Sequence, residues 1–194
     1  MPTKTTKSKK QEIFEEAAKL FQEKGYSSSS MRDLAQKVNL KVSSLYSHIG
    51  GKEEILQKIC FENANHFLEG ITQVEILKLP PSEKIKQLIR LHIKIALEDP
   101  TSITVFNDEW RYLSEPYLSD FLKMRKDYEV RFGEIIQKGI DLGEFKKLDI
   151  TVVLFTILTS VRWLHYWNPE THNLTVEDLE KNILAILMSG IHTD

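Results

Sequence analysis

The stretch that decides the fold is residues 29–52, Ser-Ser-Met-Arg-Asp-Leu-Ala-Gln-Lys-Val-Asn-Leu-Lys-Val-Ser-Ser-Leu-Tyr-Ser-His-Ile-Gly-Gly-Lys. Ser30 is placed to cap a helix, and Asp33 completes a variant capping box in which Asp replaces the usual Glu or Gln. Asn39 tolerates the left-handed backbone of a sharp turn. Helical spacing of the apolar residues supports a first helix through Met31, Leu34, Ala35 and Val38. The stretch therefore predicts a helix-turn-helix.

The second helix of this motif is rich in hydrogen-bonding groups and contains no acid, so it would not repel phosphate. Leu40, Leu45 and Ile49 are expected to pack it against the first helix. In such motifs the N-terminal residues of the second helix contact base edges in the major groove, which makes Lys41, Val42 and Ser43 the expected base readers. The full set predicted to bind double-stranded DNA is Ser29, Ser30, Lys41, Val42, Ser43, Ser44, Tyr46, His48 and Lys52.

Lys52 follows Gly50-Gly51 and opens another helix, so its ammonium and the free amides there can share one phosphate. The alternative is a solvated surface lysine. Charge is distributed unevenly: residues 1–52 hold ten Lys or Arg and five Asp or Glu, although the whole chain carries a net charge of -2. A basic head on an acidic body fits DNA contact at one end. The first lysines form a tail that either binds phosphate or only keeps the chain soluble: Lys4, Lys7, Lys9 and Lys10.

Over residues 10–56 the chain resembles the tetracycline-repressor (TetR) family of bacterial transcriptional regulators. The resemblance rests on Ile13, Ala17, Phe21, Gly25-Tyr26, Ser29-Ser30, Asp33-Leu34-Ala35, Leu45-Tyr46 and Lys52-Glu53. Three positions depart from the family pattern. Asn39 stands where Gly is usual, Lys41 where a capping Ser is frequent, and Ile49 where Phe is usual. The resemblance implies a regulator that binds DNA, not an enzyme.

The remaining 142 residues read as helices, which predicts an all-α fold with a helix-turn-helix domain (1–52) and a helical ligand-binding and dimerisation domain (53–194). Pro80-Pro81-Ser82 marks a break, and Asp99-Pro100 ends the helix that follows it. Gly143 closes a long amphipathic helix. The expected helices are about 9–24, one from 52, one that starts at the 80–82 break, a short one over 103–113, then 117–142, 149–167 and 175–190.

The last two helices invite a dimer interpretation, because helix 149–167 is apolar nearly all round. Burial inside one subunit is the alternative. The helix-turn-helix favours the dimer, since a two-fold dimer doubles the interface with a palindromic DNA site. The TetR resemblance implies that these two helices form the homodimer. The predicted dimer residues are Leu154, Leu158, Leu179, Ile183 and Ile186.

Polar and aromatic side chains interrupt the apolar faces of the middle helices, which suggests an effector site. The more frequent explanation of a residue such as His92 is a hydrogen-bonded core histidine, and Arg162 also fits an ion pair at the dimer interface or a helix end. Residues 110–167 are similar to TetR-type repressors of fatty-acid and sterol breakdown that respond to acyl-coenzyme A. That similarity implies a lipophilic effector, with Arg side chains for its phosphates. The predicted ligand residues are His92, Phe106, Trp110, Arg111, Tyr128, Arg131, Arg162, Trp163 and Tyr166.

Other functional classes have less support. A di-iron bundle enzyme needs Glu-x-x-His pairs, and the sequence contains none, so no metal or cofactor is expected. The lone Cys60 indicates a buried structural thiol and a reducing compartment. Residues 150–167 are interrupted by polar groups, which favours a bundle helix over a membrane span. We therefore expect a cytoplasmic, ligand-responsive regulator, most simply a repressor; a ligand-independent DNA-binding protein remains the alternative.

Overall fold

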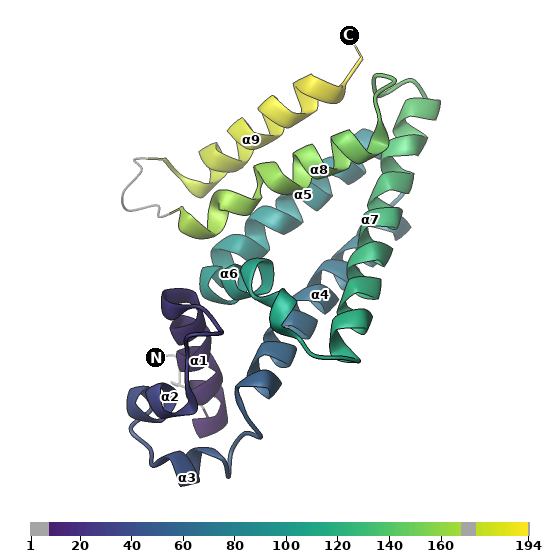
Figure 1. Ribbon diagram of the computed structural model, residues 1–194. Coiled ribbons are helices and arrows are strands. Elements are labelled where there is room, and N and C mark those ends of the chain that lie inside the picture. The colour runs from purple at the N-terminus through teal and green to yellow at the C-terminus, as the bar shows by residue number, and fades with distance from the viewer. Residues whose placement is uncertain (1–7, 168–173, 194) are drawn as a thin grey trace. The chain divides into compact units, whose positions relative to one another are not determined.

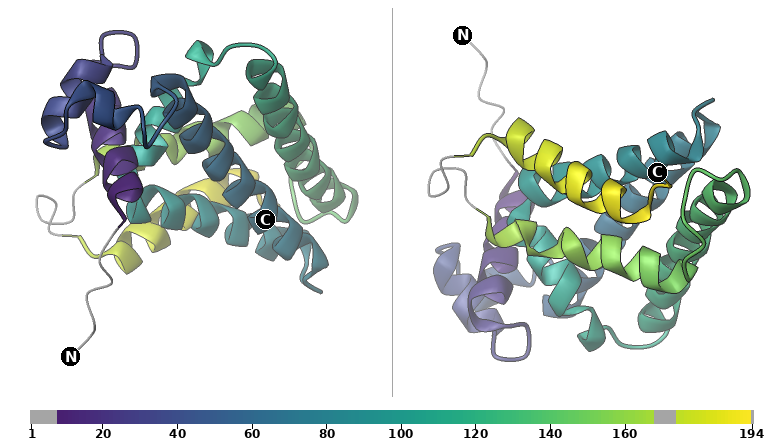
Figure 2. Two further views of the ribbon diagram at one scale, coloured as in Figure 1. Left: turned by 90° about the horizontal axis from the view of Figure 1, so that it is seen from below. Right: turned by 90° about the horizontal axis from the view of Figure 1, so that it is seen from above.

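The computed structural model describes residues 8–167 and 174–193 (Figures 1 and 2). Within these ranges the regular structure is helical, apart from an isolated backbone bridge between Phe145 and His192. The predicted all-α fold is confirmed. The chain forms two compact units: the first comprises the residues up to Asn63 with Thr101–Phe121, and the second comprises Ala64–Pro100 with the residues from Leu122 onward. The domain boundary predicted after residue 52 stays a prediction.

Three helices open the first unit, α1 (Lys9–Lys24), α2 (Met31–Lys37) and α3 (Val42–Leu45). The first helix has the expected bounds and begins in a capping box between Ser8 and Gln11. It ends at Gly25, whose φ of 80° suits a residue without a side chain. The chain then folds back, so that the ring of Tyr26 lies 5.1 Å from that of Phe21. We call residues 8–52, which contain these three helices, the head.

A later segment completes the first unit: α6 (Pro100–Asp108), the 3-10 helix η1 (Trp110–Tyr112) and the start of α7 (Tyr117–Asp141). The Nε2 of Gln22 in α1 donates a hydrogen bond to Thr104 Oγ1 at 3.0 Å. At the start of α4 (Lys52–Ile76), the Glu53 carboxylate accepts hydrogen bonds from the backbone and hydroxyl of Ser114. Periodicity does not reveal these contacts, because they join residues far apart in the sequence.

The second unit contains the rest of α4 and α7 with α5 (Pro81–Glu98), α8 (Ile150–Ser160), the 3-10 helix η2 (Arg162–Tyr166) and α9 (Val176–Ile191). Figure 2 shows α9 lying beside α5, against which it packs. Gly70 lets α4 and α5 approach closely, because a Cβ there would lie 2.3 Å from the Leu91 Cδ2. Proline at the first position of α5 starts that helix as the sequence predicted.

The prediction of one helix over residues 149–167 is wrong. α8 ends at Ser160, and a tighter 3-10 helix follows. Hydroxyl groups near this end bond to backbone carbonyls of the preceding turn: Thr159 Oγ1 donates to Phe155 O at 2.6 Å, and Ser160 Oγ donates to Ile157 O at 2.7 Å. Such bonds compete with the helical pattern. Periodicity alone carries no sign of that competition.

No helix among the described residues is both long and apolar enough to span a membrane. In the same part of the chain, no cluster of three or more His, Cys, Asp or Glu side chains is arranged to hold a metal ion.

Candidate nucleic-acid interface

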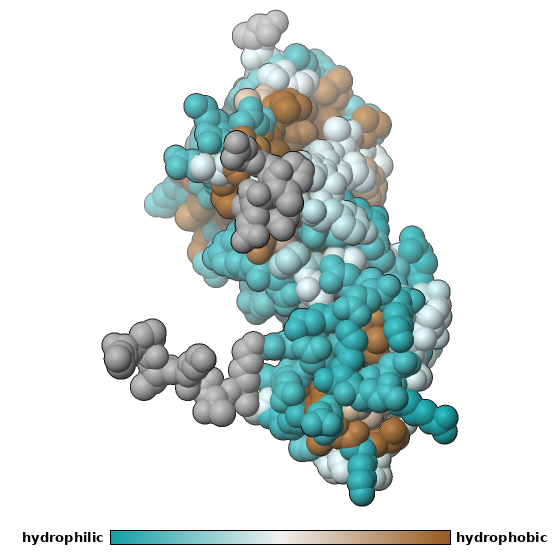
Figure 3. Space-filling model, turned by 90° about the vertical axis from the view of Figure 1, so that its left-hand side faces the viewer, coloured by the Kyte–Doolittle hydropathy of each residue, from teal (hydrophilic) through white to brown (hydrophobic). Residues whose placement is uncertain are grey.

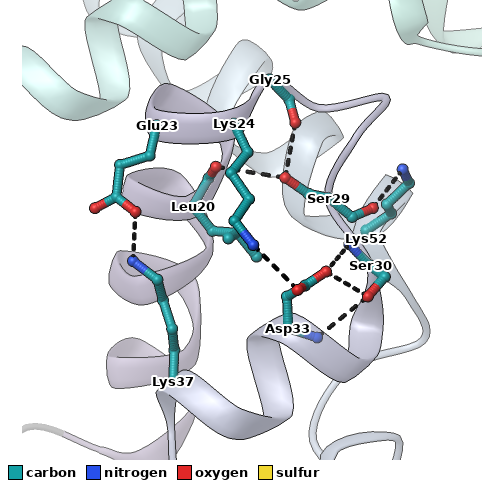
Figure 4. Close-up of polar contacts among 9 residues, drawn as sticks. All are labelled: Leu20, Glu23, Lys24, Gly25, Ser29, Ser30, Asp33, Lys37 and Lys52. Atoms are coloured by element: carbon teal, nitrogen blue, oxygen red, sulfur yellow. Dashed lines mark hydrogen bonds and ion pairs between the residues drawn. The ribbon is translucent and has the colours of Figure 1, made fainter.

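The first helix of the helix-turn-helix is anchored at its start by a reciprocal cap (Figure 4). Ser30 Oγ accepts a hydrogen bond from the Asp33 amide at 3.2 Å, and Asp33 Oδ2 accepts one from the Ser30 amide at 2.9 Å. Hydrogen bonds from the Ser30 hydroxyl and from Lys24 lower the pKa of Asp33 to about 2. The predicted capping box is confirmed, and Lys24 ties it to α1 through an ion pair of 3.2 Å.

The turn between the two helices has the geometry expected of Asn39, whose φ is 54°. The Leu40 amide donates to Ala35 O at 2.9 Å and closes the turn. α3 is only four residues long, and no side chain caps its start at Lys41. It is held instead by Leu45 and Ile49, which are 0% and 3% exposed. Packing, not capping, therefore fixes the second helix.

The outer face of α3 and of the turn after it presents the predicted base-contacting groups. Lys41, Ser43 and Ser44 are exposed, Tyr46 is 53% exposed, and Val42 is half-buried. His48 is also half-buried. No acidic residue occurs between Leu34 and Lys52, and on the face drawn in Figure 3 the surface of the head is mostly hydrophilic. This surface can accept a polyanion without a carboxylate opposing it.

Ser29 does not belong to that surface, which corrects the prediction that it binds DNA. Its side chain is only 4% exposed, and its hydroxyl donates to Gly25 O at 2.7 Å (Figure 4). The hydroxyl thus satisfies a carbonyl at the end of α1. The sequence pattern placed Ser29 beside Ser30 but could not separate an inward from an outward hydroxyl.

Lys52 is also engaged within the protein. Its Nζ donates to Tyr26 O at 2.8 Å and to Ser29 O at 3.0 Å, and lies 4.2 Å from the centre of the Tyr26 ring. Two of its three N–H donors therefore join α4 to the loop before α2. A phosphate contact by the third donor stays a prediction.

In the second unit, His92 and Tyr128 form a polar pair inside aromatic packing. His92 Nε2 lies 2.8 Å from the Tyr128 hydroxyl, and the His92 ring stacks on Phe67 at 4.6 Å. Burial lowers the pKa of His92 to about 4 and raises that of Tyr128 above its usual range. His92 is thus neutral near pH 7. Its hydrogen bond to Tyr128 agrees with the alternative that His92 is a hydrogen-bonded core histidine.

Arg131 takes part in an ion-pair network. Its Nε lies 2.9 Å from Glu75 Oε1, a second nitrogen lies 2.5 Å from Glu75 Oε2, and Thr72 accepts a further bond at 2.7 Å. Asp127 lies 3.4 Å away. The guanidinium is therefore already matched by carboxylates, which corrects the prediction that Arg131 awaits an anionic ligand.

The other predicted ligand residues are distributed between the two units. Phe106 and Trp110 pack against Phe121, with ring centres 5.6 and 6.0 Å apart, and the guanidinium of Arg111 lies over the Trp110 ring. These belong to the first unit. In the second unit Arg162, Trp163 and Tyr166 are exposed, and Tyr166 is 71% exposed. Arg162, Trp163 and Tyr166 therefore lie at the surface and not in an enclosed cavity.

The predicted dimer residues point mostly inward. Leu154, Leu179 and Ile183 are buried within the subunit, Leu158 is half-buried, and Ile186 is 71% exposed. The first three therefore belong to the core of the subunit, which corrects their assignment to the dimer interface. The apolar side chains left at the surface of α8 and α9 are instead Val152, Phe155, Val176 and Ile186.

An exposed second helix without acids, held in a capped helix-turn-helix, defines a DNA-binding regulator. Residues 13–59 match the family described as bacterial regulatory proteins, tetR family, and residues 78–191 match the tetracyclin repressor-like C-terminal domain. The chain belongs to the TetR family of transcriptional regulators. The prediction made from residues 10–56 is confirmed, and so is the prediction that the protein is a regulator and not an enzyme.

Similar proteins span nearly the whole chain. The HTH-type transcriptional repressor KstR2 of Mycolicibacterium smegmatis is 26% identical over 190 residues, which is 95% of this chain and 91% of that protein. The structure of the ketosteroid transcriptional regulator KstR2 of Mycobacterium tuberculosis has a TM-score of 0.89 at 23% identity and covers 98% of both chains. AibR, solved with isovaleryl coenzyme A and operator DNA, has a TM-score of 0.81 at 23% identity over 93% of this chain and 98% of that one. The structural matches show that the fold is shared.

Proposed function

We propose that this protein is a cytoplasmic, ligand-responsive repressor that binds a palindromic operator as a homodimer and leaves it when a small lipophilic effector binds. The observation that carries the DNA-binding part is the exposed, acid-free face of α3 with Lys41, Ser43 and Ser44. Lys41 and Val42 suit a guanine and a thymine methyl, and the serines accept either base type.

The operator is expected to contain two half-sites about one helical turn, or a multiple of it, apart. Footprinting on the DNA next to the coding sequence locates the site, and sedimentation gives the stoichiometry. Two subunits on a two-fold site support the proposal. Tight binding of a monomer to one half-site contradicts the homodimer but not the DNA contact.

The homodimer is proposed to form through the exposed apolar side chains of α8 and α9. On α8 these are Val152 and Phe155, which are 63% and 41% exposed; Phe155 also borders an open groove of about 380 Å³ between α7 and α8. On α9, Ile186 stands beside exposed Ala185, whose small side chain permits close helix approach. Figure 3 shows apolar side chains gathered on the surface of the second unit. Phe155→Glu should shift sedimentation toward the monomer, whereas Gln73→Glu, exposed on α4 and outside this groove, is the control.

The proposed effector is lipophilic or amphipathic, with an acyl-coenzyme A as the first candidate. AibR was solved with isovaleryl coenzyme A, and the relatives named KstR2 include a ketosteroid regulator. In this chain the support is the His92–Tyr128 pair, a neutral donor and acceptor among aromatic rings in the second unit. Such a pair suits an ester, thioester or keto oxygen better than a phosphate.

Release would follow from a ligand-favoured geometry in which the two recognition helices no longer match the groove spacing. α4 and α7 each contribute residues to both compact units, which gives a covalent route for that change. Coupling must be reciprocal, so operator DNA should lower effector affinity by the factor that effector lowers DNA affinity. Isothermal titration with acyl-coenzyme A and with a ketosteroid, with and without operator, tests this. Equal affinity in both states refutes the release mechanism.

Ligand-independent DNA binding is the alternative. A thermal-shift series separates the two, because a ligand at a hundred times its dissociation constant stabilises the folded state by about 2.7 kcal/mol. Absence of a shift with acyl-coenzyme A and ketosteroids of several chain lengths would favour the alternative.

A further inference from the structure

Most of the cationic side chains of the head already have a partner within the protein. Six of the eight Lys and Arg side chains in residues 8–52 are bound to carboxylates or backbone carbonyls nearby. The ion pairs are Lys9–Glu12, Lys10–Glu54, Lys19–Glu16, Lys24–Asp33 and Lys37–Glu23, and Lys52 binds the carbonyls of Tyr26 and Ser29. Three of these pairings are visible in Figure 4.

Arg32 and Lys41 are the two exceptions. Both side chains are exposed, and within the described part of the chain neither has an ion pair or a hydrogen bond. The distinction matters for a polyanion. A lysine about 3 Å from a carboxylate contributes almost no net charge at the distance of a phosphate, and moving it to the phosphate leaves that carboxylate unopposed. Because Arg32 and Lys41 have no carboxylate partner, each can bind a phosphate with its full charge and leaves no carboxylate unopposed.

Arg32 lies on the exposed side of α2. Leu34 and Ala35 face the core, while Asp33 and Lys37 form ion pairs with α1. The side chain one turn after Arg32, Gln36, is also exposed. In a helix-turn-helix the second helix enters the major groove and the first helix crosses the phosphate backbone. An exposed, unpaired arginine on the first helix is thus placed on the element that meets phosphates.

We propose that Arg32 binds an operator phosphate and is, with Lys41, a principal source of side-chain charge by which each head holds DNA. Its planar guanidinium can donate two parallel hydrogen bonds to one phosphate, which an ammonium cannot do. Arg32 fixes the position of α2 on the backbone, and Lys41 contacts the groove from the start of α3. This proposal rests on DNA binding by the head and does not depend on the effector.

The salt dependence of binding gives a quantitative consequence. Each neutralised phosphate contributes a slope of about -0.9 to the plot of log affinity against log salt. Two copies of Arg32 in a dimer therefore account for about -1.8. If instead all lysines of the head acted equally, removing any of them would flatten the slope by the same amount.

The test compares Arg32→Gln with Lys37→Gln in the full chain on the mapped operator. Both variants remove one charge from an exposed side chain of α2, but Lys37 is paired at 2.7 Å with Glu23. Arg32→Gln should flatten the slope by about 1.8 and lower affinity about tenfold near 0.1 M salt, with base preference unchanged. Lys37→Gln should alter affinity less than about threefold and leave the slope as it is. Arg32→Lys should keep the slope and lose part of the affinity.

Equal effects of Arg32→Gln and Lys37→Gln would overturn the proposal, because net charge alone would then explain both. An unchanged slope in Arg32→Gln would overturn it as well. Circular dichroism and thermal unfolding verify that both variants are folded. Failure of the unmodified protein to bind any operator would instead contradict the DNA-binding function, so the two failures are distinguishable.

Discussion

The head and the second unit differ in how their arginines are paired. On the head, Arg32 and Lys41 stand exposed and unpaired in the described part of the chain. In the second unit, Arg131 is held by Glu75 and Asp127, and Arg90 lies 2.7 Å from Glu180. The arginine of the head is therefore available to a polyanion, whereas Arg131 and Arg90 of the second unit are bound to carboxylates of neighbouring helices. A cation in a sequence predicts an anion partner, but only the structure shows whether the protein already supplies it.

Lys52 provides the sharpest test of this distinction. Lys52→Met keeps the aliphatic stem but leaves the carbonyls of Tyr26 and Ser29 without their charged donor. We expect a loss of about 2–3 kcal/mol in the free energy of unfolding by urea. Lys58→Met on the same helix, whose lysine is exposed, should cost under about 0.5 kcal/mol. A fully stable Lys52→Met with a salt slope flatter by about one per subunit would restore the phosphate role.

Lys41 tests the opposite side of the comparison. Lys41→Ala should relax base preference by about 1–3 kcal/mol at one operator position while leaving the stability of the head unchanged, because the side chain has no internal partner. Competition among operators substituted one base pair at a time measures the preference. Ser47→Ala is the control, since its hydroxyl donates to Ser44 O at 2.6 Å. If the preference survives in Lys41→Ala, the residue binds phosphate only.

His92 extends the comparison to pH. Because burial lowers its pKa to about 4, below the unfolded value of about 6.5, its contribution to stability is present above pH 6.5 and is lost as the pH falls toward 4. We expect a loss of about 2 kcal/mol over that window, less than the full shift because the ring is not wholly shielded from water. Thermal unfolding should show a flatter pH profile in His92→Gln than in His66→Gln, where the histidine is exposed. Identical profiles would contradict a buried neutral ring.

Arg131 gives the smallest expected effect. A double-mutant cycle with Arg131→Gln and Glu75→Gln should show a coupling of about 1 kcal/mol in unfolding free energy, since the pair is bidentate but partly exposed. The same guanidinium holds the pKa of Glu75 below its usual value. Zero coupling, together with lost effector binding in Arg131→Gln, would return Arg131 to the ligand site.

Features governed by local chemistry were predictable from the sequence. The capping box at Ser30, the left-handed Asn39 and the start of α5 at Pro81 follow from the conformational preferences of single residues. Features that depend on distant partners were not. The inward hydroxyl of Ser29 and the carbonyls that bind Lys52 depend on how three segments meet, and no spacing rule contains that information. The role proposed for Arg32 could not be predicted either, because the sequence does not show that this side chain lacks an ion-pair partner.

Cys60 offers a practical consequence of its surroundings. Burial raises the pKa of this single thiol to about 12, so almost none of it is thiolate at pH 8. A thiol reagent can then react only when α4 opens locally, so the labelling rate measures how often that opening occurs. Any bound molecule that stabilises this stretch of α4 should slow the labelling of Cys60. The native cysteine can therefore report ligand binding without an engineered probe.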